Sequence, residues 1–212
     1  MGRLERLARK RAATVDVKLS KRVRTRPHTP GSWPAYIYVK VPPLSDRLLD
    51  ADASRHLPCS ADFIPDAELH ISLSKQLYLK HFQIQPLVTA LTTAVARLRM
   101  PAFQCDYGPG VCILRNEEDT RCFAALSVSA GRPELTSLTA EIDSVLARFG
   151  HPVFHDPAIF HTSFSSWLPQ DGHSQRLEEE QAVQQLVVDD GEPFCVSEVH
   201  ISAGGKDFLL PL

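Results

Sequence analysis

The sequence predicts an α+β fold of two pseudo-symmetric lobes, each an antiparallel sheet with flanking helices, with an active-site cleft between the lobes. Two observations predict it. The order strand, helix, strands occurs twice along the 212 residues. In each half a strand with a His-x-Ser pattern leads into a helix, at His70–Ser72 and at His161–Ser163.

The first half begins with a run of aromatic and β-branched residues, which is typical of a strand. The expected elements are a strand at Ala35–Val41, a helix within Leu44–Leu57, a strand at Glu68–Ser74 and a helix at Pro86–Leu98. The second strand alternates strictly, so His70, Ser72 and Ser74 face one side of it.

The second half repeats this order. The first expected strands are Ala102–Tyr107 and Val111–Asn116 around a turn at Gly108–Gly110, followed by a strand at Arg121–Ser129 and a helix at Glu134–Phe149. A strand at Ile159–Ser165 and a helix at Gln175–Val187 come next. The last expected strands are Phe194–Ser202 and Asp207–Leu212 around a turn at Gly204–Gly205. The alternation places His161, Ser163 and Ser165 on one face.

Charge divides the chain into two parts. Residues 1–26 contain ten Lys and Arg against two acidic residues, although the whole chain has a net charge of −2. We expect a basic, flexible arm at 1–26 and one domain at 27–212. No run of about 18 apolar residues predicts a membrane span. The five cysteines form no C-x-x-C, which favours reduced thiols in an intracellular protein.

A histidine and a serine two residues apart on a strand point to the same side, about 6.6 Å apart along the chain. Two such pairs facing one phosphate can supply a neutral imidazole that accepts a proton and a charged one that donates a proton. The serine hydroxyls can donate to the phosphate oxygens, so this chemistry needs no metal.

Chance produces about one His-x-Ser/Thr pattern in a chain with nine histidines and 27 Ser and Thr, and three occur. The third, His200–Ser202, leads into a Gly-Gly hairpin and not into a helix. We interpret His200 as a strand histidine that faces solvent or a neighbour. No nucleotide-binding glycine motif or zinc motif is present, so we expect neither cofactor nor metal.

Around these two histidines the sequence resembles the two-histidine (LigT-like) phosphoesterase superfamily, and within it the branch of exonucleases that trim the oligouridine tail of U6 spliceosomal RNA. The resemblance covers about residues 22–212. It is carried by RVRTRPHTPGSW, LHISLSKQLYLKHFQIQPLVTAL, NEEDTRCFAALSV, HDPAIFHTSFSSW and GGKDFLLPL.

The resemblance implies that His70 and His161 are the catalytic pair and that Ser72 and Ser163 bind the scissile phosphate. It implies 3′-to-5′ removal of nucleotides by attack of a 2′-hydroxyl, leaving a 2′,3′-cyclic phosphate or a 3′-phosphate. The expected partner is RNA, the oligouridylated 3′ end of U6 snRNA, and the protein is expected to be a nuclear monomer that does not bind membranes. A first assignment makes His70 the base and His161 the acid; the sequence leaves this open.

The sequence departs from the family pattern where a tyrosine stacks on the terminal base. Phe154 occupies that place, beside His155, and we expect both to contact the substrate. Two alternatives remain: an RNA 2′,3′-cyclic phosphodiesterase or 2′,5′-ligase-like enzyme with the same histidines, and an RNA-binding module without activity.

Overall fold

The computed structural model describes residues 30–44, 57–58, 61–64, 69–169 and 193–212. The arm at 1–26 and the helix expected at Gln175–Val187 lie outside the described residues, and so does most of the helix expected within Leu44–Leu57. The domain boundary at residue 27 therefore stays a prediction.

Two helices and ten strands make up the described part of the chain. The helices are α3 (His81–Leu98) and α4 (Arg132–Arg148). The strands are β1 (Trp33–Lys40), β2 (Asp62–Phe63), β3 (His70–Ser72), β4 (Leu77–Leu79), β5 (Phe103–Arg115), β6 (Cys122–Ala130), β7 (His161–Trp167), β8 (Phe194–Val196), β9 (Glu198–Ala203) and β10 (Lys206–Pro211).

The strands pair in the order β10-β9-β1-β3-β7-β6-β5-β8, and every pairing is antiparallel. Strand β2 is an additional partner of β7, and β4 of β1. One half of this order combines the N-terminal strands β1 and β3 with the C-terminal strands β9 and β10, the other half consists of β5 to β8, and the two halves join between β3 and β7. The α+β class is confirmed, with the sheets of the two lobes continuous at this junction.

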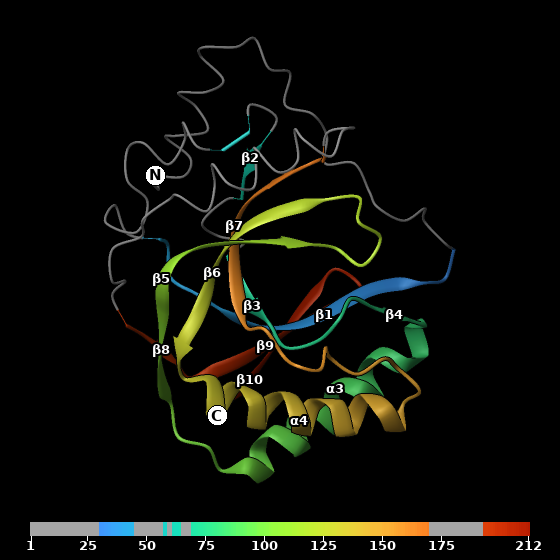
Figure 1. Cartoon of the computed structure of the whole chain (residues 1–212). Helices are drawn as coiled ribbons and strands as arrows, with labels where there is room; N and C mark the ends of the chain where they lie inside the picture. Colours follow the sequence, from blue (N-terminus) through green and yellow to red (C-terminus); the bar gives the residue numbers. More distant parts are fainter. Residues whose placement is uncertain (1–29, 45–56, 59–60, 65–68, 170–192) are drawn as a thin grey trace.

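The sheet is curled (Figure 1). Strands β8 and β9 stand far apart in the pairing order, yet one residue, Ser197, separates them in the sequence. A single residue can connect them only if the sheet bends back on itself. The Leu212 backbone N–H donates to the Ser197 carbonyl at 3.0 Å and holds the C-terminus at this connection. The single strand expected at Phe194–Ser202 is therefore two strands with different partners.

Helices α3 and α4 contact each other and lie together on one side of the sheet (Figure 1). Each buries one apolar stripe in a core that is continuous through the described residues. The buried apolar residues of the stripes are Ile84, Leu87, Val88, Leu91, Ala94 and Val95 on α3, and Leu135, Leu138, Ile142, Val145 and Leu146 on α4.

Helix α3 begins five residues before the expected start at Pro86. The Gln83 side chain accepts a hydrogen bond from the Lys80 backbone N–H at 2.8 Å, which caps the earlier start. The turn expected at Gly108–Gly110 is also wrong, because β5 runs through it. Its register against β6 shifts between Tyr107 and Val111, so the extra residues form an irregularity within one long strand.

The glycine before α4 is required by its surroundings. Gly131 has φ +81°, and a Cβ there would lie 2.5 Å from Cys105 Sγ and 2.7 Å from the Gln104 carbonyl. Gly150, after α4, has φ +74° with nothing within 4 Å of an added Cβ. The positive φ disfavours an L side chain at both positions, but only at Gly131 would a side chain also clash with neighbouring atoms.

We expect Gly150→Ala to lower the free energy of unfolding by about 1 kcal/mol, the conformational cost alone. Gly131→Ala should cost a further 1–3 kcal/mol, roughly, because backbone and core atoms must move. Urea denaturation of both variants measures the difference. Equal losses in the two variants would contradict the steric explanation.

Candidate active site

The strands that carry the two His-x-Ser patterns are hydrogen-bonded neighbours. The central residues of the patterns lie opposite each other in the antiparallel register of β3 and β7. One step in either direction sets His70 opposite Ser163 and Ser72 opposite His161. Side chains in such positions have Cβ atoms about 4.5–5.5 Å apart. The register therefore gathers the four residues into one cluster, with each serine across from the histidine of the other pattern.

The central residues, Ile71 and Thr162, point away from this cluster into the core, where both are 0% exposed. The Tyr107 hydroxyl is hydrogen-bonded to Thr162 Oγ1 at 2.9 Å, and burial raises the pKa of Tyr107, so it remains a neutral phenol. This contact holds β7 from the core side. Because side chains alternate, the four polar residues occupy the opposite face, where each is half-buried.

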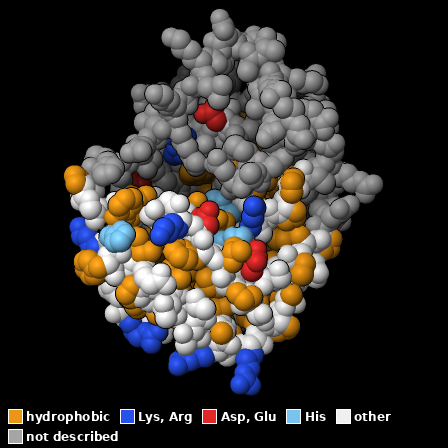
Figure 2. All heavy atoms as spheres, turned by 180° about the vertical axis from the view of Figure 1, so that it is seen from behind, with side chains coloured by type: hydrophobic (Ala, Val, Ile, Leu, Met, Phe, Trp, Pro, Cys, Tyr) orange, Lys and Arg blue, Asp and Glu red, His pale blue; other side chains and the backbone are white. Residues whose placement is uncertain are grey.

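We call the surface that bears this cluster the histidine face of the sheet. The register extends it to both sides: Tyr38 and Lys40 of β1 lie opposite Ser72 and His70, and Ser127 of β6 lies opposite His161. Figure 2 shows histidine side chains gathered beside acidic and basic ones at the edge of a hollow.

His161 has a defined hydrogen-bonding state. Its Nδ1 lies 2.8 Å from the carbonyl oxygen of Ile159, which can only accept, so Nδ1 carries the hydrogen and Nε2 is the nitrogen available for reaction. Burial lowers the pKa of His161, and charge on His70 and His155 lowers it further, against a raising effect of the Ile159 hydrogen bond. His161 is therefore neutral at neutral pH. The same interactions show that the three histidines lie near one another.

Two serines expected on the histidine face lie elsewhere. Ser74 is 4% exposed, and its Oγ accepts the Ile37 backbone N–H at 2.9 Å, because β3 ends at Ser72 and the chain turns. Ser165 is 0% exposed and donates to the Asp62 carbonyl at 3.0 Å. A register shift between β6 and β7 after Ser163 breaks the alternation there.

Phe154 and His155 precede β7 and differ sharply in exposure. Phe154 is 8% exposed and stacks on Phe160, with ring centroids 6.0 Å apart at 13°. His155 is exposed and makes an edge contact with Phe154 at 5.2 Å. Of the two rings, His155 is therefore the accessible one, and the buried Phe154 packs against it.

His200 lies on the histidine face and faces neighbours. It is opposite Tyr38 in the register of β9 and β1, and the two rings stack with centroids 5.2 Å apart at 24°. Its Nε2 lies 3.1 Å from a carboxylate oxygen of Glu198. Sequence reasoning gave no role to His200 or Tyr38. Their alternation could be read from the sequence, but their closeness to His70 depends on strand order.

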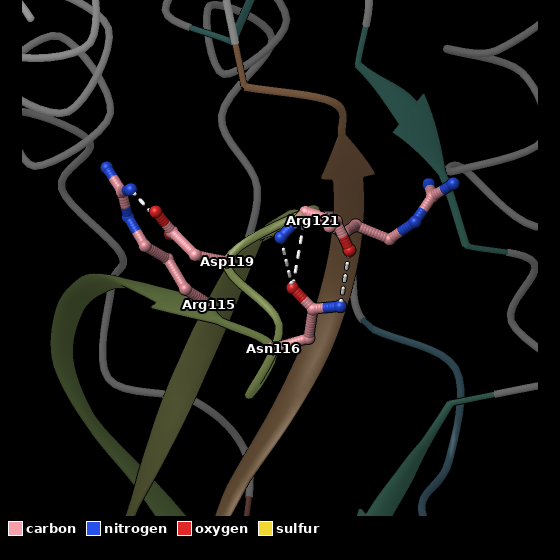
Figure 3. Close-up of polar contacts among 5 residues, drawn as sticks. Arg115, Asn116, Asp119 and Arg121 are labelled. Atoms are coloured by element: carbon pink, nitrogen blue, oxygen red, sulfur yellow. Dashed lines mark hydrogen bonds and ion pairs between the residues drawn. The ribbon is translucent and has the colours of Figure 1, made fainter. Parts of the chain in front are cut away.

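Arg121 is a third residue without a role in the sequence reasoning. It follows a turn organised by Asn116, whose side-chain oxygen accepts the backbone N–H groups of Thr120 and Arg121 at 2.8 and 2.9 Å (Figure 3). The Arg121 guanidinium is largely buried, at 9% exposed, and donates to Ser166 Oγ of β7 at 3.3 Å. This places a cation beside the strand that carries His161.

The remaining features of the described residues lie apart from this cluster. A groove between α3 and α4 is lined in part by Gln85, Thr89, Arg97 and Arg148. No group of three or more His, Cys, Asp or Glu side chains is arranged to hold a metal ion within the described part. None of the described helices has the length and apolar character to cross a membrane.

Comparison with known structures finds the same fold in Usb1 and LigT. Kluyveromyces marxianus Usb1 has a TM-score of 0.60 at 15% identity, covering 84% of this chain and 98% of that one. Escherichia coli LigT in complex with 3′-AMP has a TM-score of 0.53 at 16% identity, covering 85% and 95%. At these identities the likeness concerns the fold alone.

Sequence comparison is more specific. The family model HVSL, described as an uncharacterised conserved protein, matches residues 7–206. U6 snRNA phosphodiesterase 1 of Mus musculus is 32% identical over 211 residues, which cover 93% of this chain and 75% of the mouse protein. The chain therefore belongs to the HVSL family, the family of U6 snRNA phosphodiesterase 1.

Proposed function

We propose that this protein is a metal-independent 3′-to-5′ RNA exonuclease that trims the oligouridine tail of U6 snRNA by 2′-hydroxyl transesterification. One observation carries the proposal: the β3–β7 register makes the two histidines and two serines of the patterns cross-strand neighbours on one face of the sheet. The name of its relatives, U6 snRNA phosphodiesterase 1, supports the substrate. That substrate implies a nuclear protein, and we propose that it acts as a monomer.

In this reaction one imidazole removes the proton of the penultimate 2′-hydroxyl, which attacks the adjacent phosphorus. The other imidazolium gives a proton to the departing 5′-oxygen, and the terminal nucleoside leaves. The new O–P bond closes a 2′,3′-cyclic phosphate, which water can open to a monophosphate. Hydroxyl hydrogens of Ser72 and Ser163 donate to the non-bridging oxygens as charge develops there.

The terminal base is proposed to lie beside β7, stacked on His155 with Phe154 behind it. The exposure of the two side chains supports this assignment, because the His155 ring is accessible to a base and the Phe154 ring is buried. Stacking on an aromatic ring tolerates every base. Uridine preference would then require hydrogen bonds in addition to this stacking.

Two alternative functions remain. The first, a cyclic phosphodiesterase or 2′,5′-ligase-like enzyme, would use the same histidines, and the second, an RNA-binding module, would bind the same RNA, so each needs its own measurement. A cyclic phosphodiesterase or 2′,5′-ligase-like enzyme acts on ends that already carry a phosphate. An RNA-binding module binds the tail and leaves its length unchanged.

His70→Ala and His161→Ala should each slow trimming of an oligouridine-tailed RNA by about 10²- to 10⁴-fold, the usual contribution of a general acid or base. Binding of the same RNA, measured by fluorescence anisotropy, should persist. His81→Ala removes an exposed histidine from α3 and serves as the matched control. Trimming at the normal rate in either active-site variant would remove that histidine from the mechanism.

An RNA whose penultimate nucleotide lacks its 2′-hydroxyl should resist trimming, whereas one that lacks only the terminal 2′-hydroxyl should be trimmed. Mass analysis of the all-ribose product should find a 2′,3′-cyclic phosphate or a 3′-phosphate, formed equally well in EDTA. Cleavage of the deoxy-penultimate substrate, or loss of activity in EDTA, would exclude this chemistry.

The pH dependence of kcat/KM should be bell-shaped, since one histidine must be neutral and the other charged. Because burial lowers the pKa of His161 from its ordinary 6.5, one midpoint should fall below 6.5. Two midpoints above 6.5 would show that neither limb reports this ring.

A further inference from the structure

A strip of aromatic rings adjoins the histidine cluster on the side away from β7. It consists of Tyr36 and Tyr38 of β1 and His200 of β9, which we call the aromatic strip. The tyrosine rings stack with centroids 5.0 Å apart at 28°, and Tyr38 stacks on His200. Both tyrosine rings also contact the His70 ring, at 5.9 Å from Tyr36 and 5.3 Å from Tyr38. The strip is therefore continuous with the cluster.

The strip combines an open ring with rings that are held in place. Tyr36 is 39% exposed, whereas His200 is 9% exposed and held by Glu198. Burial and the negative charge of Tyr36 and Asp207 raise the pKa of Tyr38, so its hydroxyl remains a donor. Cross-strand stacking stabilises a sheet by itself. That purely structural role accounts for the Tyr38–His200 pair, but it gives no reason for Tyr36 to expose its ring beside His70.

The order of strands decides which part of an RNA can reach the strip. Neighbouring strands are about 4.8 Å apart, so the strip begins one strand away from His70 and extends to the second. His155 belongs to the segment that precedes β7, and its charge acts on His161. A phosphate over the cluster joins two nucleosides, and with the terminal one beside β7, the next one lies over β1 and β9.

We propose that the aromatic strip is a stacking subsite for the base of the penultimate nucleotide, whose 2′-hydroxyl attacks the scissile phosphate. This rests on the proposed function and extends it to a second nucleotide. Stacking there holds the attacking ribose close to the phosphorus while the terminal nucleoside leaves. Because every base has an aromatic face, the subsite increases affinity without selecting uridine.

The test measures binding, so it does not depend on turnover. Two fluorescent oligouridines carry a 2′-deoxyribose at the penultimate position, which prevents the reaction, and one of them also lacks the base there. Fluorescence anisotropy gives the affinity of each for the full-length wild-type protein, Tyr36→Ala and Tyr36→Phe. Phe82→Ala removes a more exposed aromatic ring, 76% exposed, from helix α3 and is the matched control.

Wild-type protein should bind the RNA with the penultimate base at least about fivefold more tightly than the abasic RNA. Tyr36→Ala should lose this preference and bind the abasic RNA as wild type does, while Tyr36→Phe and Phe82→Ala should keep it. No preference in wild type, or equal weakening for both RNAs in Tyr36→Ala, would overturn the subsite. Failure of the proposed function would appear separately, as wild-type protein that leaves an all-ribose tail intact.

Discussion

The pairing of β3 with β7 is the constraint on which the site depends. These strands come from opposite halves of the chain, and their register places Ile71 directly opposite Thr162. A slip of one residue would turn a histidine strand over, because side chains alternate between faces. A slip of β3 would expose Ile71 and bury His70, and a slip of β7 would expose Thr162 and bury His161. The core thus enforces the arrangement of the polar cluster.

Contacts on both sides of this pair reinforce it. Behind β7, Tyr107 binds the Thr162 hydroxyl, so a buried polar side chain has its partner. Beside β3, the hydroxyl of Ser74 accepts a backbone N–H of β1 and ties those strands together. The curl of the sheet brings β8 and β9 together at Ser197, while both helices pack on one side of the sheet. Rigid strands, rather than loops, therefore carry both proposed catalytic histidines.

Electrostatics and exposure divide the face into regions with different chemistry. Burial of His161, together with the charges of His70 and His155, lowers its pKa and keeps it neutral, as one member of an acid–base pair must be. His155 presents an exposed ring in the segment before β7, and the aromatic strip presents rings from β1 and β9. The buried Arg121 adds a positive charge beside β7. The proposed phosphate site at the centre, with a proposed base position beside β7 and another over β1 and β9, suits RNA cleavage between the last two nucleotides.

The sequence by itself determined the fold class, the helical stripes and the alternation that sets each histidine beside a serine, because these follow from local periodicity. The tertiary structure alone decided which strands are neighbours. Strand order brought Tyr38 beside His70 and His200 beside Tyr38, and a register shift moved Ser165 into the core. The tertiary structure also buried Phe154 and left His155 exposed to solvent. Local periodicity says which way a side chain points from its own strand, but its partners depend on long-range pairing and core packing.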